Sequence, residues 1–212
     1  MQIPHRSFRA ALIALVLTLA ISGADAATLG DYTVGFSAER TLVIDGKSYI
    51  GRMAAMPGRE RHEQKMQGFS PVFLLRADQP LADVVLAQLH TIVQFALPPE
   101  LRILGRPELK KKPLGRDTVN GVVTTKYAID ETVPEGHASG TLWLSAEGIP
   151  MRLVGNFVAE NGKPSTIRWE LKDVKIGPQP AVLFEAPAGY SKLPPEAVAP
   201  LLGLRLKSAA RK

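Results

Sequence analysis

The sequence contains no cysteine. This absence excludes a disulfide framework, a thiolate metal site and a lipid attached to a cysteine after signal cleavage. Long apolar runs are also missing near the N-terminus, where the charge-free apolar run at 10–21 has only twelve residues. As a helix this stretch would cover roughly 18 Å, against a hydrocarbon core of ~30 Å. A cleavable signal therefore fits better than the alternative, an anchor helix that is never cut.

The N-terminus has the three parts of a secretory signal peptide. Arg6 and Arg9 precede the apolar run at 10–21, and Ala24-Asp25-Ala26 supplies small residues at the two positions that a signal peptidase reads. We expect cleavage after Ala26, which would leave the mature protein free in the periplasm. The expected organisation is a signal peptide at 1–26, one domain at 27–194, and a short helix with a basic tail at 195–212.

Basic residues exceed acidic ones, and the formal net charge is +6. The excess is concentrated at residues 102–116 and at the C-terminus. Such runs can contact anionic lipid or acidic partners, and any peripheral membrane contact is expected through Lys110, Lys111 and Lys112. A solvated loop and a solvated tail are the simpler interpretation. Nucleic-acid binding is not expected, because no aromatic residues interleave with these charges.

Motifs for catalysis are absent from the sequence. No phosphate-binding glycine loop, nucleophile elbow or acidic metal loop occurs, and His62, His90 and His137 stand singly. Alternation places His62 beside Glu60 and Gln64 on one strand face. That arrangement could form half of a metal site, although a solvated strand face is the preferred interpretation. We predict no enzyme activity, no cofactor and no metal.

Alternation with a period of two is the dominant pattern after Tyr32. The apolar positions that point one way are Val34, Phe36, Ala38, Leu42 and Ile44. Asp45-Gly46 predicts a hairpin turn, since both positions tolerate positive φ. The return strand is expected at about 47–56, a very polar strand at 59–66, and another strand at 71–76. This pattern indicates an antiparallel meander with one solvated face.

Residues 81–97 are apolar enough for one helix or for two strands. Val84, Val85 and Ile92 favour strands, whereas Leu86 to Leu89 would tolerate a helix. A hairpin that turns near His90 is the preferred prediction.

The second half predicts another meander. Residues 99–109 are expected to form a short helix or a lid-like loop, and residues 110–115 a basic linker. Asn120-Gly121 and Asn161-Gly162 then predict hairpin turns. In total the sequence predicts nine to eleven strands, with a short helix at 195–204.

Three motifs in this half resemble a pattern found in exported bacterial proteins. They are Gly115-Arg116-Asp117-Thr118-Val119-Asn120-Gly121, then Gly140-Thr141-Leu142-Trp143-Leu144-Ser145 followed by Gly148-Ile149-Pro150, and finally Leu183-Phe184-Glu185-Ala186-Pro187-Ala188-Gly189-Tyr190. On these motifs the chain resembles the lipoprotein-carrier-like (LolA/LolB) superfamily, in an uncharacterised exported branch.

The resemblance implies a mainly β fold, in which a curved antiparallel sheet forms an unclosed barrel with short helices over its concave face. In characterised relatives the enclosed cavity holds acyl chains or a lipoprotein. No functional residue of the family is carried over to this sequence. Phe184 is expected to pack in the core, while Pro187 and Gly189 turn the chain and Tyr190 fills a gap.

The functional prediction is a periplasmic binding or carrier module for a hydrophobic ligand, either a lipid or an acylated protein. The alternative is an envelope protein-interaction module without a ligand. Large or soft side chains are predicted to face the concave side and contact the ligand. These are Phe36, Met53, Trp143, Met151, Phe157 and Trp169. For each of them taken singly, a core-filling role is the simpler interpretation.

Overall fold

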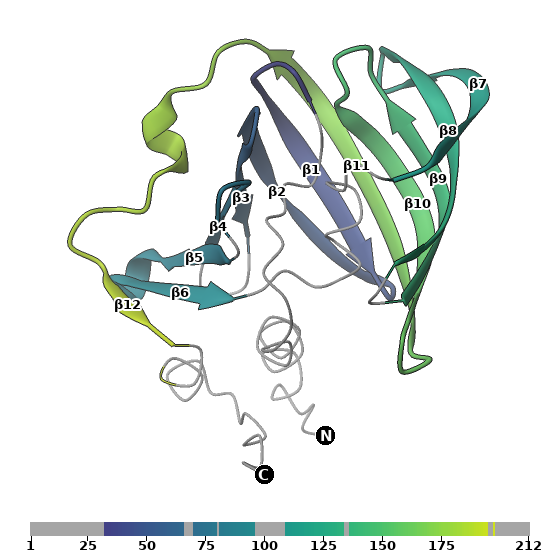
Figure 1. The fold of residues 1–212 in the computed structure, drawn as a ribbon. Helices are drawn as coiled ribbons and strands as arrows, with labels where there is room; N and C mark the ends of the chain where they lie inside the picture. The colour runs from purple at the N-terminus through teal and green to yellow at the C-terminus, as the bar shows by residue number, and fades with distance from the viewer. Residues whose placement is uncertain are drawn as a thin grey trace, which may run out of the picture.

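A single sheet of twelve strands forms the described part of the chain (Figure 1). The computed structural model describes residues 32–65, 70–79, 81–95, 109–133, 136–194 and 197. The strand order is β12-β6-β5-β4-β3-β2-β1-β11-β10-β9-β8-β7. All neighbouring pairs are antiparallel except β12 and β6, which run parallel. The strands at the two ends, β12 and β7, are not paired with each other, so the sheet is not closed into a barrel.

The first half of the chain builds one side of the sheet. Its strands are β1 (Phe36–Ile44), β2 (Lys47–Met56), β3 (Arg59–Gln64), β4 (Val72–Arg76), β5 (Ala82–Leu86) and β6 (Thr91–Phe95). The second half builds the other side and returns at its end to the first. Its strands are β7 (Lys111–Val119), β8 (Val122–Val133), β9 (Gly136–Leu144), β10 (Pro150–Ala159), β11 (Pro164–Ile176) and β12 (Ser191–Leu193).

The predicted hairpins form where turn residues accept positive φ. Asp45 and Gly46 have φ values of 49° and 77°, and Asn120 and Gly121 have values of 48° and 82°. His90 also adopts a left-handed conformation, with φ 46°, and ends a short 3-10 helix, η1 (Ala87–Leu89). The ambiguous segment 81–97 therefore contains a strand pair that turns near His90, and the preferred prediction is confirmed.

Two strands differ from the sequence prediction. A basic linker is predicted at residues 110–115, but all of these except Lys110 belong to the edge strand β7. The alternation of apolar and polar residues does not reveal this strand, because residues 111–118 are exposed on both faces. The second is β12, a three-residue strand that pairs with β6 through Ser191, Lys192 and Leu193. The predicted number of nine to eleven strands is therefore too low.

One face of the sheet carries the main core, and we call it the inner face. Phe36, Ala38 and Leu42 of β1 point to this face and are buried. The same apolar cluster includes Val93 of β6 and Ile129 of β8, although these strands lie near opposite ends of the sheet. Side chains from distant strands can share one cluster only where the sheet bends around them. The inner face is therefore the concave face, as the curvature in Figure 1 also indicates.

Glycines on the inner face help this bend. Gly140 of β9 lies directly opposite Gly155 of β10. A Cβ atom on Gly140 would lie 2.5 Å from the carbonyl oxygen of Val154 and 2.6 Å from the Cα of Gly155. A side chain at this point would force the two strands apart, so glycine is required for their close approach.

The C-terminal segment crosses the opposite face of the first half. Arg59 forms an ion pair with Glu185, and Arg61 Nη1 donates to the carbonyl oxygen of Leu183 at 3.2 Å. Phe184, in the 3-10 helix η3 (Ala181–Phe184), is fully buried. Tyr190 packs against a second small apolar cluster of Leu74, Val85 and Ile92. The predicted packing of Phe184 and Tyr190 is confirmed.

No helix within the described ranges is long and apolar enough to cross a membrane. The predicted signal peptide at 1–26, nearly all of the helix or lid at 99–109, and all but Ala197 of the helix at 195–204 lie outside the described residues.

Candidate functional site

All six predicted ligand-contacting residues belong to the main apolar cluster, and four of them point to the inner face. Met53 opposes Ala38, Trp169 opposes Leu42, and Phe157 opposes Ala138, and directly opposed residues share a sheet face. Met151 is fully buried in the same cluster, at a bulge where β10 has one residue more than β9. The fourth inner-face residue is Phe36, which is fully buried.

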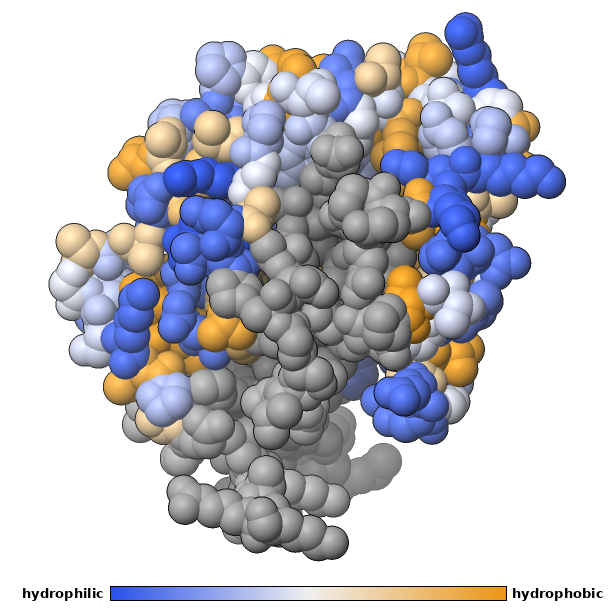
Figure 2. Space-filling model, in the orientation of Figure 1, coloured by the Kyte–Doolittle hydropathy of each residue, from blue (hydrophilic) through white to orange (hydrophobic). Residues whose placement is uncertain are grey.

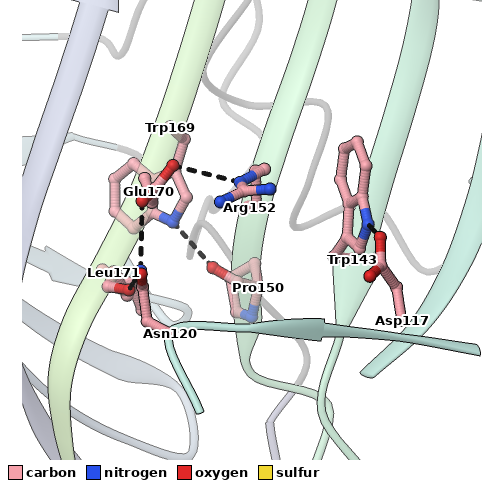
Figure 3. A network of polar contacts seen from close by, with 8 residues as sticks. All are labelled: Asp117, Asn120, Trp143, Pro150, Arg152, Trp169, Glu170 and Leu171. Atoms are coloured by element: carbon pink, nitrogen blue, oxygen red, sulfur yellow. Dashed lines mark hydrogen bonds and ion pairs between the residues drawn. The ribbon is translucent and has the colours of Figure 1, made fainter. Parts of the chain in front are cut away.

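Trp143 faces the other side of the sheet (Figure 3). It opposes Arg152 and Lys126, and its ring centroid lies 5.7 Å from the Arg152 guanidinium and 5.3 Å from Lys126 Nζ. Its Nε1–H donates to Asp117 at 2.8 Å. The expectation that Trp143 faces the concave side is therefore wrong, because the register of β9 directs Leu142 inward instead.

The inner face also carries buried polar residues, which we call the inner polar cluster. Its members are Tyr32, Arg40, Glu60, His62 and Gln64, and none is more than 6% exposed. Three of them lie on the β3 face for which solvation is the preferred sequence interpretation, so that interpretation is wrong. Glu60 lies opposite Ala55 of β2, and His62 lies opposite Met53 of the same strand. Both apolar partners belong to the concave core.

Arg40 is a member of the cluster that the sequence reasoning missed. It occupies an inward position of β1, between Ala38 and Leu42, and is buried. The sequence signal that could have identified Arg40 is a charged residue at an inward position of an otherwise apolar alternation. Lys and Arg are almost never fully buried without a partner, so this position calls for an explanation.

Hydrogen bonds link the cluster into one chain. Tyr32 Oη donates to Glu60 at 2.5 Å, and His62 Nε2 lies 2.9 Å from the other carboxylate oxygen of Glu60. The His62 Nδ1 atom lies 3.4 Å from Arg40 Nη1, and Arg40 Nη2 donates to Gln64. Because Arg40 can only donate, Nδ1 must accept and the proton of a neutral His62 lies on Nε2.

A glycine makes this chain geometrically feasible. Gly51 of β2 lies between Arg40 of β1 and Gln64 of β3 on the inner face. A Cβ atom at Gly51 would lie 3.3 Å from Arg40 Nη2 and 1.9 Å from the carbonyl oxygen of Glu63. Without a side chain there, the guanidinium crosses β2 and reaches the third strand.

The burial of the cluster shifts its protonation equilibria. Burial lowers the pKa of Arg40 to about 10, against the opposing attraction of Glu60. Burial also lowers the pKa of His62, in the same direction as the Arg40 charge, while Glu60 acts in the opposite direction. Burial and Glu60 together raise the pKa of Tyr32 well above its ordinary value. At neutral pH the cluster therefore combines a charged Arg40, a neutral His62 and a protonated Tyr32.

We expect acid to destabilise the protein through His62. In the unfolded chain this histidine binds a proton near its ordinary pKa of about 6.5, whereas in the folded protein it does so only at lower pH. The unfolded state therefore binds more protons in this window, and the free energy of unfolding falls as the pH drops through about 6.5. Urea denaturation at a series of pH values between about 7.5 and 5 measures the slope.

The His62→Gln variant should show a shallower pH dependence over this window. His137→Gln is the matched control, because the His137 side chain is 46% exposed, and it should retain the wild-type slope. Equal slopes for His62→Gln and the wild type would contradict a buried neutral His62.

The basic residues predicted to contact partners lie at the edge of the sheet. Lys111 and Lys112 are exposed on β7, and Lys110 Nζ lies 3.9 Å from Glu131. Figure 2 shows hydrophilic side chains gathered over the end of the sheet that bears β7 and β8. Within the described ranges, no group of three or more histidine or acidic side chains is arranged to hold a metal ion.

The arrangement defines a class of protein by its fold: an open, strongly curved antiparallel sheet with an apolar concave face. An open, curved antiparallel sheet is the architecture that the sequence resemblance implies. No protein-family model matches the chain. No curated protein matches it significantly either.

Solved structures match the chain over most of its length. An uncharacterised conserved protein from Thermus thermophilus shares 15% identity, with a TM-score of 0.50, over 76% of this chain and 91% of that one. MucB, solved in complex with MucA(peri), shares 16% identity with a TM-score of 0.45, over 74% of this chain and 55% of that one. The LolA superfamily protein NE2245 from Nitrosomonas europaea shares 11% identity with a TM-score of 0.41, over 73% of this chain and 91% of that one.

Proposed function

We propose that this chain is an exported, periplasmic binding or carrier protein that holds a hydrophobic molecule noncovalently against the inner face of its sheet. The observation that carries the proposal is the concave apolar lining, to which strands near both ends of one open sheet contribute. A sheet whose end strands are not paired with each other is not fixed to one circumference, so its interior can adapt to a guest. The proposal includes cleavage after Ala26 and a ligand-binding domain at 27–194.

The inner-face members of the predicted set are the proposed ligand contacts. Phe36, Met53, Phe157 and Trp169, with Met151 at the bulge, offer large or adaptable apolar surface. Trp143 is not among the proposed ligand contacts, because it lies on the face of the sheet opposite the inner face. Burial of an acyl chain would contribute about 0.8 kcal/mol per methylene, from which the cost of association must be subtracted.

Native mass spectrometry of the protein purified from the cell envelope tests the proposal directly. We expect a co-purifying lipid or a mass shift on addition of dodecanol, a neutral single-chain probe. The absence of both a retained lipid and dodecanol binding would contradict the proposal.

A pair of methionines on one strand provides a matched test of the binding face. Met53 of β2 is buried on the inner face, whereas Met56 of the same strand is half-buried and points to the other face. Met53→Gln puts an amide of similar size into the apolar lining and should weaken dodecanol binding about tenfold, since an unpaired buried amide costs on the order of 1–3 kcal/mol. Met56→Gln should leave binding within about twofold of the wild type, because its face is not part of the proposed site. Equal effects of the two changes would place the ligand elsewhere.

The second candidate, an envelope protein-interaction module, is favoured by the exposed basic strand β7. Both of its faces are exposed over residues 111–118, and within the described sheet its outer edge has no neighbouring strand. Pro113 and the bulge that follows it limit further strand pairing, so an acidic partner would be held mainly by charge. Replacement of Lys110, Lys111 and Lys112 by glutamate should abolish co-purification of such a partner while leaving dodecanol binding unchanged.

A further inference from the structure

Arg40 is a buried cation in the middle of an apolar face. The residue is 6% exposed, and none of the ion pairs formed between described residues includes it. The two carboxylate oxygens of Glu60 contact Tyr32 and His62. Burial of a charge without a directly paired counter-charge is among the most costly arrangements in a protein interior.

The described residues that contact the guanidinium all do so through neutral groups. These groups are the ring nitrogen of His62, the amide oxygen of Gln64 and the face of Trp169, whose centroid lies 5.7 Å from Arg40 Cζ. The Nε atom of Arg40 is buried and has no hydrogen-bond acceptor in the described part of the chain. Such orphaned donors are rare in proteins and mark strain or function.

The geometry of the guanidinium indicates which acceptor group would complete its hydrogen bonds. Its N–H groups form a planar fork that matches two oxygen atoms of a carboxylate or phosphate. The absence of a side chain at Gly51 lets Nη2 reach the neighbouring strand, and the ring of Trp169 lies against the guanidinium from β11. The residues around this fork lie on the same inner face that we assign to the acyl chain.

We propose that Arg40 is the seat for an oxyanion carried by the hydrophobic ligand, so that the ligand class is an anionic amphiphile with a carboxylate or phosphate at one end. This inference rests on the proposed function. The oxyanion supplies the acceptor that Arg40 Nε lacks, and the apolar chain lies along Met53, Phe157 and Trp169. An inorganic anion without a chain gains no apolar burial to offset the cost of its desolvation at the buried Nε, so it should not bind.

Single-chain probes of equal length test the proposal with the full mature protein. Isothermal titration calorimetry compares dodecanoate, dodecyl phosphate, dodecanol, dodecyltrimethylammonium and inorganic phosphate. We expect the two anionic probes to bind at least about tenfold more tightly than dodecanol, because hydrogen bonds to a charged partner are stronger than neutral ones. The cationic probe should bind more weakly than dodecanol, and inorganic phosphate should not bind. The ratio of dodecanoate to dodecyl phosphate affinity identifies the preferred oxyanion.

Three variants separate the inference from general packing effects. Arg40→Met should remove the preference for anions while retaining dodecanol binding, and Arg40→Lys should keep part of the preference. Gln64→Glu places an internal carboxylate at the same guanidinium in a side chain of the same size, and should also remove the preference. It keeps the test decisive if Arg40→Met does not fold. As the control, Arg152→Met, on the other face of the sheet, should retain the full preference.

The outcomes distinguish the oxyanion seat from the proposed function. Equal affinity of the wild type for dodecanol and the anions, or an anion preference that survives in both Arg40→Met and Gln64→Glu, overturns the oxyanion seat alone. Inorganic phosphate binding as tightly as dodecyl phosphate would show a simple anion site and also overturn it. Failure of every chain-bearing probe to bind overturns the proposed function together with this inference.

Discussion

Replacement of Trp169 by alanine is expected to lower the free energy of unfolding by about 3–5 kcal/mol, a typical loss for a large buried aromatic side chain. Trp169 is 2% exposed and contacts residues of three other strands. Its ring lies edge-on to His62 at 6.0 Å and beneath Arg40, and its Nε1–H donates to the carbonyl oxygen of Pro150 at 2.7 Å. Removal of the ring therefore leaves a cavity in the inner face and takes a donor from this carbonyl. Equilibrium urea denaturation followed by far-UV circular dichroism measures the change.

The other tryptophan provides the control for this experiment. Trp143 is also buried, but it is flanked by the long side chains of Lys126 and Arg152 on the opposite face. These side chains can collapse into the space that Trp143→Ala leaves, so we expect roughly half the loss seen for Trp169→Ala. Equal losses would argue against a central structural role for Trp169. Since the chain has only two tryptophans, each variant also retains a single fluorescent reporter on a known face.

Replacement of Glu60 by alanine should cost about 3 kcal/mol of unfolding free energy, as expected when one partner is removed from a buried charged network. Glu60 is fully buried and accepts hydrogen bonds from Tyr32 and His62. Its loss takes the acceptor from both donors and removes the negative charge that offsets Arg40. The loss should be partly reversed in the double variant with Arg40→Met, because the uncompensated cation is then absent. A double-mutant cycle in urea measures this coupling.

Glu63 on the same strand serves as the matched control. It points to the other face, and its side chain is 47% exposed in an ion pair with Arg61 at 2.9 Å. Exposed ion pairs contribute little, so Glu63→Ala should cost less than about 1 kcal/mol. A Glu60→Ala variant as stable as Glu63→Ala would show that the inner polar cluster does not contribute to the fold.

Local sequence signals predict the hairpins well. Asp45-Gly46 and Asn120-Gly121 specify tight turns by their tolerance of positive φ, and the alternation of Phe36, Ala38 and Leu42 identifies one buried face. These features depend on near neighbours in the chain. They can therefore be predicted without knowledge of which strands pair over long distances.

The inner polar cluster cannot be predicted in the same way. Arg40 and His62 lie on strands separated by β2, and Trp169 comes from a strand far along the sequence. The polar pattern of β3 is equally consistent with a solvated face and with a buried network. Only the position of β3 on a curved sheet decides between them. The edge strand β7 escapes prediction for the opposite reason: with both faces exposed, no alternation is required of it.

By itself the sequence determined most of the strands, the turns and the apolar side of β1, because the energetics of alternation and of left-handed turn residues are local. The tertiary structure alone decided that the inner faces of the two halves of the sheet meet, that Trp143 lies on the other face, and that Gly51 lets a buried Arg40 reach the third strand. Those features arise from register and curvature, which are set by contacts between residues distant in the chain. Burial of a charge is a property of that assembled surface, and no single strand contains the information.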